Sequence, residues 1–367
     1  MLLRLALLCL ACCASARAED ADVQPLPVGE VVLEQRAGAA ENALLDVGVV
    51  IFDAGIPPDP STHGALGIFP EIRRAEARYL PALLRQTLVD SNAWGAVRVM
   101  PETAVLPELL VTGTIERSDG RALQLAIRAE DATGRCWLDR VFTDESTPDD
   151  YPVTPGGDPY ADVYRAIANE LLAVRDTLGE QDLQEIRRVA FLRYAAGLSP
   201  EAFAGYLAGG GQEAYRVSRL PAEGDPMIAR VERIRNQEYL FIDTVDEQYL
   251  ALRDEMADTY NLWRQYDRER AIYLADYERR AADRGSQGSR GSFAAMQQSY
   301  NAYRSIKIQE QDLGEVALGF NNEVAPTVVE VSGRVFRLNG TLDSQYGDWR
   351  RILREIFALE TGLQGSQ

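Results

Sequence analysis

The segment 226–284 contains no internal glycine or proline, so no residue within it interrupts a helix. At about 1.5 Å per residue, an unbroken helix of this length would extend on the order of 90 Å. Its mean apolar repeat of about 3.6 residues favours a helix packed on neighbouring elements over a strict supercoil with a period of 3.5. The repeating positions are Val245, Tyr249, Leu252, Met256, Tyr260, Trp263, Tyr266, Arg270, Tyr273 and Tyr277. The sequence therefore predicts one long helix that needs cover for its apolar face.

We expect this helix to lie within a helical region over residues 179–325. The stretch 285–292 is rich in glycine and serine and is typical of a flexible link. A second helical stretch begins at Phe293, which predicts a helical hairpin or bundle that also uses helices from 180 to 208. The second stretch is too short to cover the whole aromatic face of the long helix. The rest of that face must pack against other helices, the N-terminal domain or a partner. If a partner covers it, Trp263 and Tyr266 are the expected anchors, because large aromatic side chains dominate binding energies.

Residues 1–18 are predicted to form an export signal. Arg4 supplies the positive start, an apolar stretch too short to span a bilayer follows, and Ala16 and Ala18 form a small-x-small cleavage site. In the alternative, the segment is a lipoprotein signal, and Cys13 or Cys12 carries the lipid anchor. Residues 19–44 have the composition of a spacer. No later segment approaches the length of a transmembrane helix, so we expect none in the mature chain.

Residues 45–178 are predicted to form an α+β domain. A strand at 46–52 precedes a loop at 54–70 that contains His63, and then a helix that carries Ile72 and Leu84 on one side. Four short strands follow, at 97–99, 109–115, 123–127 and 136–142, with hairpin turns at Asp119-Gly120 and Thr133-Gly134. A helix over 160–178 closes the order β-α-β-β-β-β-α.

Four segments of this domain carry a resemblance to known proteins. They are Leu83-Leu84-Arg85-Gln86-Thr87-Leu88, Trp94-Gly95-Ala96-Val97-Arg98-Val99, Leu109-Leu110-Val111-Thr112-Gly113-Thr114-Ile115 and Asp131-Ala132-Thr133-Gly134-Arg135. With these segments the domain is similar to the auxiliary lipoproteins of bacterial ABC transport systems and to the N-terminal α/β domain shared by TolB-like and CsgG-like outer-membrane assembly proteins. The resemblance implies a small periplasmic domain that binds partners and catalyses no reaction.

The C-terminal residues 326–367 are predicted to form a β-hairpin and a helix. The two strands, 328–331 and 334–338, are joined at Ser332-Gly333. The helix is amphipathic, with one apolar face formed by Trp349, Ile352, Leu353, Ile356 and Phe357.

Composition excludes several classes of chemistry. The formal net charge of −18 makes nucleic acid and anionic lipid poor partners. The only lysine, Lys307, lies between two isoleucines, which excludes a P-loop and a Ser-x-x-Lys nucleophile, and one histidine excludes a His-Glu-x-x-His zinc site. Gly209-Gly210-Gly211 starts a match to the dinucleotide fingerprint, but the preceding residues 199–208 are predicted to be helical. We expect no cofactor or metal, and Cys136 is expected to be a small core residue.

The sequence therefore favours a non-enzymatic, exported accessory or assembly protein of the bacterial cell envelope that acts through protein–protein interaction. We expect it in the periplasm, with association to the outer membrane as an option, and envelope proteins as partners. Two alternatives stay open: a periplasmic binding protein for a small ligand, and a carboxylate-based hydrolase of envelope glycans. Four acidic residues of the long helix are expected to form a solvated face, namely Glu247, Asp254, Glu255 and Asp258.

Overall fold

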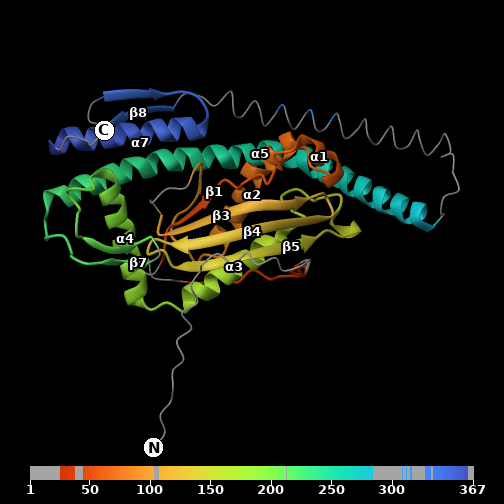
Figure 1. Cartoon of the computed structure of the whole chain (residues 1–367), viewed down its shortest axis with the longest axis horizontal. Helices are drawn as coiled ribbons and strands as arrows, with labels where there is room; N and C mark the ends of the chain where they lie inside the picture. Colours follow the sequence, from red (N-terminus) through yellow and green to blue (C-terminus); the bar gives the residue numbers. More distant parts are fainter. Residues whose placement is uncertain are drawn as a thin grey trace, which may run out of the picture.

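The computed structural model has the predicted α+β composition, with a mixed sheet, a very long helix and a C-terminal hairpin and helix (Figure 1). The structure describes residues 25–37, 44–102, 107–211, 213–283, 327–331 and 334–362, together with 308, 311 and 315. The predicted signal with Cys12 and Cys13, the helical stretch from Phe293, and Lys307 lie outside the described residues.

The sheet has the order β2-β1-β3-β4-β5. Strand β1 runs parallel to both β2 and β3, and the remaining pairs are antiparallel. The predicted turns at Asp119-Gly120 and Thr133-Gly134 join β3 to β4 and β4 to β5, as expected. The strands are β1 (Val47–Val50), β2 (Val97–Met100), β3 (Leu109–Ser118), β4 (Ala122–Asp131) and β5 (Cys136–Glu145).

Two long helices, α2 (Pro70–Asp90) and α3 (Ala161–Asp176), pack with the sheet in one core. Burial alternates along β4: Leu123, Leu125 and Ile127 are buried in this core, while the residues between them are half-buried. Successive side chains of a strand point to opposite faces, so one face of the sheet packs in the core with the helices. The predicted loop at 54–70 contains a short helix, α1 (Pro60–Leu66), which the sequence analysis missed. Asp59 caps its N-terminus, and Pro60 occupies the first helical position.

A second hairpin follows α4 (Glu180–Leu198) and corrects one expectation. Residues 199–208 are not helical: they form turns and then strand β6 (Leu207–Gly210), which pairs antiparallel with β7 (Glu213–Val217). The run Gly209-Gly210-Gly211 has positive φ throughout, a conformation that favours glycine. Strand β6 includes the first two of these glycines, and the element after them is its hairpin partner β7. The strand-to-helix turn that a dinucleotide site requires is therefore missing there.

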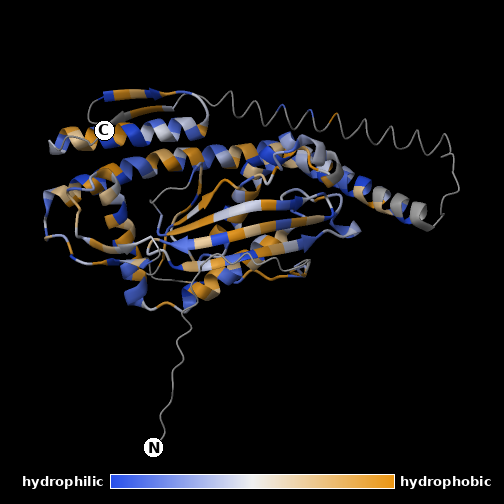
Figure 2. Ribbon diagram, in the orientation of Figure 1, coloured by the Kyte–Doolittle hydropathy of each residue, from blue (hydrophilic) through white to orange (hydrophobic). Residues whose placement is uncertain are grey.

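Helix α5 (Pro226–Asp283) confirms the predicted long helix and lies along the side of the α+β layer (Figure 1). Figure 2 shows apolar and polar residues alternating along it, as expected for a helix with one covered face. Its middle, including Leu252, Met256 and Tyr260, belongs to the core of the sheet and α2. Its first half, including Ile242 and Val245, belongs to a second core shared with α4 and the C-terminal elements. A single helix thus joins both cores.

The C-terminal elements are β8 (Thr327–Val331), β9 (Arg334–Leu338) and α7 (Leu342–Thr361), as predicted. Thr341 caps α7, and Gly362 ends it in a left-handed conformation. Trp349 is fully buried and stacks on Phe241 of α5 with ring centroids 6.0 Å apart. The amphipathic face of α7 therefore packs on the first half of α5.

Residues 25–37, part of the predicted spacer, lie against the domain, and we call them the strap. Val28 N donates to the Thr143 carbonyl at 2.8 Å, at the outer edge of β5. Asn169 of α3 accepts a hydrogen bond from Glu34 N and donates one to the Val32 carbonyl, both at 2.9 Å. Side chains of α3 thus hold the backbone of this part of the predicted spacer. None of the helices in the described ranges is both long and apolar enough to cross a membrane.

Candidate functional site

Buried charged groups fix α5 against α2 and the loop before α3. Arg264 of α5 is completely buried, and its guanidinium donates to Asp158 Oδ2 at 2.8 Å and lies 4.4 Å from the centre of the Tyr260 ring. The Tyr260 hydroxyl donates to Glu76 Oε1 at 2.7 Å, and Glu76 pairs with Arg73 at 3.1 Å. Buried charges of this kind are tolerated only when paired and hydrogen-bonded, so they specify one docked position of α5.

The backbone of α5 also approaches the β3–β4 turn closely. A Cβ atom on Gly120 would lie 2.3 Å from the Arg264 carbonyl oxygen and 2.5 Å from Arg268 N, and its φ is +72°. One turn further along, Asp267 is buried and pairs with Arg270 at 2.6 Å. Burial raises the pKa of Asp267 to about 6. The close approach at Gly120 leaves no room for a side chain between the β3–β4 turn and α5.

The structure shows how exposed the two expected partner anchors, Trp263 and Tyr266, are. Trp263 is 1% exposed and packs edge-on against Phe69 and parallel to Tyr260, so the chain itself covers this indole. The prediction that Trp263 anchors a partner is therefore wrong, because its side chain has almost no exposed surface for a partner to contact. Tyr266 is half-buried, and its role as an anchor stays a prediction.

Two hollows are both lined by the glycines Gly156 and Gly157. The first, of about 540 Å³, lies between α2, α5 and the loop 152–157. The second, of about 950 Å³, lies between the strap, α2, the same glycines and the start of α3. The hollows share Leu83, Gln86 and the two glycines, and we refer to the pair as the trough.

Five carboxamide side chains line the trough. Gln86 Nε2 donates to Asp90 Oδ1 at 2.8 Å, and Gln35 Nε2 donates to the Asp90 carbonyl at 3.1 Å. Asn261 accepts a hydrogen bond from Arg264, which leaves its amide NH₂ group for another acceptor. The full set, contributed by three different parts of the chain, is Gln35, Gln86, Asn92, Asn261 and Gln265. Since a carboxamide both donates and accepts, this lining suits a ligand that does the same.

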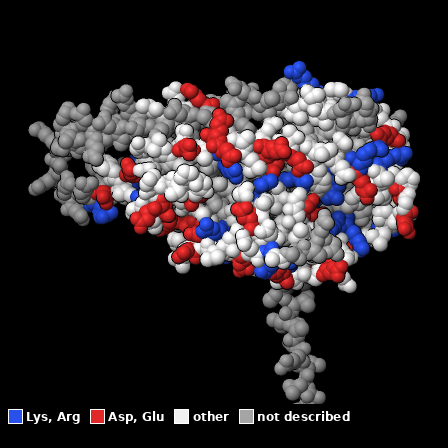
Figure 3. Space-filling view, turned by 180° about the vertical axis from the view of Figure 1, so that it is seen from behind, with Lys and Arg blue, Asp and Glu red and all other residues white. Residues whose placement is uncertain are grey.

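The trough is also partly apolar and carries excess negative charge. Large apolar side chains left exposed in the fold line it, namely Val32, Val89 and Leu262. Its charged lining comprises five carboxylates and two guanidinium groups: Glu30, Asp90, Asp158, Asp254, Asp258, Arg165 and Arg253. On the face of the molecule in Figure 3, acidic and basic side chains are interspersed over the surface.

Two buried tyrosines, Tyr79 and Tyr164, line the trough. Tyr79 lines the first hollow, and burial raises its pKa to about 12. Tyr164 lines the second hollow and is 2% exposed, and its hydroxyl makes no hydrogen bond within the described part of the chain. Burial raises the pKa of Tyr164 well above its usual value, so both tyrosines are neutral at physiological pH.

No family model, curated protein or solved structure matches this chain. The resemblance of residues 45–178 to envelope proteins therefore stays a prediction. The trough itself was not predicted from the sequence. The only local signal for it was the proline- and glycine-rich loop 152–157, because the other lining residues come from segments far apart in the chain.

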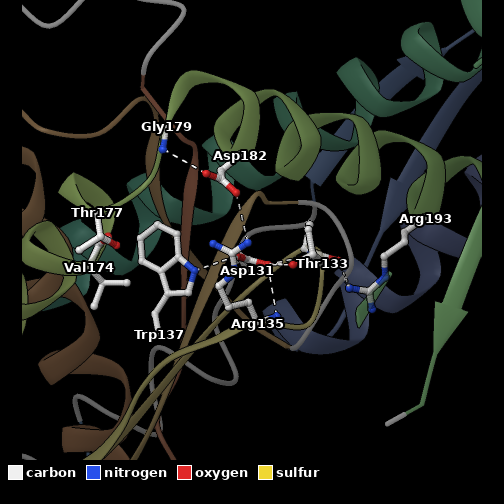
Figure 4. A network of polar contacts seen from close by, with 10 residues as sticks. Asp131, Thr133, Arg135, Trp137, Val174, Thr177, Gly179, Asp182 and Arg193 are labelled. Atoms are coloured by element: carbon white, nitrogen blue, oxygen red, sulfur yellow. Dashed lines mark hydrogen bonds and ion pairs between the residues drawn. The ribbon is translucent and has the colours of Figure 1, made fainter. Parts of the chain in front are cut away.

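Residues 131–135, one of the segments that carry the resemblance, form the turn between β4 and β5. Asp131 accepts hydrogen bonds from Thr133 N and from Trp137 Nε1, both at 2.8 Å (Figure 4). Arg135 reaches Asp182 at the start of α4, and Arg193 of α4 donates to the Ala132 carbonyl at 2.7 Å. These contacts tie the β4–β5 turn to α4 and account for the polar residues of this motif.

The remaining candidate residues are dispersed. His63 lies on α1, half-buried, with Nε2 2.7 Å from the Pro57 carbonyl oxygen, and Cys136 is half-buried at the start of β5. The described ranges contain no cluster of three or more His, Cys, Asp or Glu residues that would hold a metal ion. The four acidic residues that were expected on a solvated face of α5 are exposed, but Asp254 and Asp258 line the trough whereas Glu247 and Glu255 do not.

Proposed function

We propose that this chain is an exported, non-enzymatic accessory protein of the bacterial cell envelope that binds another protein in the trough. The observation that carries the proposal is the lining of the trough, where carboxamides, exposed apolar side chains and a glycine loop border one depression. Protein interfaces combine these features: apolar side chains that lose water, and polar groups that pair across the contact.

The carboxylates of the trough give less support to glycan hydrolysis. Asp254 and Asp258 are one helical turn apart on the same wall, and both are exposed. A glycosidase needs two carboxylates that flank the scissile bond, with burial to raise the pKa of the acid. The opposite wall of the first hollow, formed by Tyr79, Leu83, Gln86 and the loop 152–157, has no carboxylate.

The hollows also suit a small ligand in size, since typical ligand sites have volumes of about 300 to 1,000 Å³. A small-ligand binding protein is therefore the second candidate function. The two candidate functions differ in how far the bound molecule extends. A partner protein must extend beyond the rim of the trough, whereas a small ligand does not.

Site-specific photocrosslinking in intact cells tests the proposal. A photoreactive residue in place of Gln86, which lines both hollows, is expected to give a discrete protein–protein crosslink. The same residue in place of Glu247, on α5 but outside the trough, serves as the control and is expected to give none. Absence of a protein crosslink at position 86, or an equal crosslink at both positions, would contradict the proposal.

A further inference from the structure

The strap already shows how this fold holds an extended segment. Asn169 uses both atoms of its carboxamide on the strap backbone, accepting from Glu34 N and donating to the Val32 carbonyl. Asp162 accepts a hydrogen bond from Val31 N at 3.0 Å. Side chains of helix α3 thus hold the backbone of an extended segment.

The trough has the same kind of donors and acceptors, directly beside the strap. Residues 30–33 and Gln35 of the strap form one wall of the second hollow, and Gln86 of α2 borders both hollows. Gln86 and Gln35 each donate through the amide nitrogen to Asp90, and this leaves their carbonyl oxygens to accept from a ligand. Asn261 has the opposite arrangement, with its amide NH₂ group left to donate. A peptide backbone presents both groups in alternation.

The apolar and charged residues of the trough indicate which side chains a bound segment would carry. Val32, Val89 and Leu262 are exposed and would be covered by apolar side chains of a bound segment. Carboxylates outnumber guanidinium groups, and neither Asp258 nor Glu30 forms an ion pair with any described basic residue. Both arginines of the lining are engaged, Arg253 with Asp254 at 2.6 Å and Arg165 with Asp162 at 2.9 Å. The net field in the trough therefore attracts cations.

An oligosaccharide is a weaker match to this lining. Sugars bind on exposed aromatic ring faces as well as on amides and carboxylates, but Tyr79 and Tyr164, the aromatic residues of the trough, are 3% and 2% exposed. Neither ring offers a face to a ligand.

We infer that the trough binds an extended peptide segment of a partner protein, read through its backbone by the carboxamides and selected for basic and apolar side chains. This inference rests on the proposed function and adds the chemical class of the segment that is bound. Asp258, which has no basic partner among the described residues, and Asp254, which is paired with Arg253, supply the negative charge on the α5 wall. The exposed apolar residues of the trough cover the apolar side chains of the segment.

Fluorescence anisotropy with the full chain tests the inference. The probe is a labelled, end-blocked eight-residue peptide of alternating Lys and Val, compared with a Glu and Val peptide and with a Lys and Val peptide N-methylated along its backbone. We expect saturable binding of the first with Kd below about 1 mM, and binding of the other two weaker by about tenfold or more. Equal binding of the acidic peptide would overturn the charge selection, and equal binding of the methylated peptide would overturn backbone reading.

Matched variants locate the site. Asp254→Asn with Asp258→Asn is expected to weaken binding of the Lys and Val peptide by about tenfold. Glu247→Gln with Glu255→Gln removes the same charge from the same helix outside the trough and is expected to leave Kd unchanged. An equal effect of both pairs would show attraction by the whole acidic molecule and overturn the assignment to the trough.

Failure of the inference is distinguishable from failure of the proposed function. If no peptide binds while the position 86 crosslink to a protein persists, the class of segment is wrong and the proposed function stands. If maltohexaose or a chitin oligosaccharide binds in place of the peptides and the crosslink is absent, both are wrong.

Discussion

Charged residues are seldom fully buried, yet Arg73, Glu76, Arg264 and Asp267 are all buried where α5 meets the domain. Each is paired with an opposite charge, and Arg264 and Glu76 also contact tyrosines. Replacing one partner would leave the other charge buried and uncompensated, which is far more costly than losing a surface ion pair. Of these contacts, Arg264 with Asp158 and Tyr260 with Glu76 connect α5 to the domain, so they contribute to its position beside the apolar stripe.

Gly120→Ala is expected to destabilise the fold by about 2–4 kcal/mol, because the new methyl group would clash with the α5 backbone at Arg264. Gly134→Ala is the matched control, since its φ is also positive, at +89°, but the nearest atom to the new Cβ would be 3.9 Å away. It should cost only about 1 kcal/mol. Chemical denaturation measures both free energies of unfolding, and equal losses would contradict the role given to the close approach.

Asp144→Asn is expected to remove part of the pH dependence of stability. Burial, together with the nearby Asp162 carboxylate, raises the pKa of Asp144 from 3.8 to about 7. The folded chain then holds this proton more tightly than the unfolded chain, so raising the pH from 5 to 7 should destabilise the wild type by about 2 kcal/mol through this group.

The amide introduced by Asp144→Asn would keep an oxygen for Val163 N, which now donates to the Asp144 carboxylate at 3.2 Å, and would not ionise. The difference in free energy of unfolding between variant and wild type, measured at pH 5 and pH 7, isolates this contribution. Asp139→Asn, on the exposed side of β5, should retain the wild-type dependence. A variant curve parallel to that of the wild type would argue against the assignment to Asp144.

At the scale of elements, α5 is a shared component of two cores and not a free arm. Its first half packs with α4 and α7, and its middle with α2 and the sheet. Glu238 of α5 accepts hydrogen bonds from Tyr194 of α4 and Tyr346 of α7, at 2.8 and 2.7 Å. Three helices thus meet at one buried carboxylate, which fixes their relative rotation.

Trp349→Ala in α7 is expected to cost about 3–5 kcal/mol, because it leaves a cavity between Phe241 and Phe336. Hydrogen exchange should rise over α7 and β9 more than over the five-stranded sheet. Arg351→Ala, on the exposed side of the same helix, serves as the control and should cost under about 0.5 kcal/mol. A loss of less than about 1 kcal/mol in Trp349→Ala would mean that α7 is peripheral to the fold.

At the scale of the whole molecule, the strap links the N-terminal residues to the domain and forms one wall of the trough. The structure therefore couples the position of the strap to the shape of the trough, because Gln35 and Val32 belong to both.

Asn169→Ala is expected to release the middle of the strap. Loss of its two backbone hydrogen bonds should increase exchange of the Glu34 amide about tenfold, equivalent to about 1.4 kcal/mol of local stability. Gln184→Ala, on the exposed side of α4, should leave that exchange rate unchanged. If exchange at Glu34 in Asn169→Ala is the same as in the wild type, the strap is held by its other contacts.

Sequence periodicity alone predicted the strands of the sheet, the long helix and the C-terminal hairpin and helix, because these depend on residues close together in the chain. It did not predict the short helix α1, the hairpin at the triple glycine or the docked strap, where capping and distant hydrogen bonds override the local composition. Only tertiary structure decided that Trp263 is a core residue and that Asp254 and Asp258 line a trough while Glu247 and Glu255 do not. A helical repeat specifies which residues share a face, but what covers that face depends on segments far away in the sequence whose shape and charge must match it.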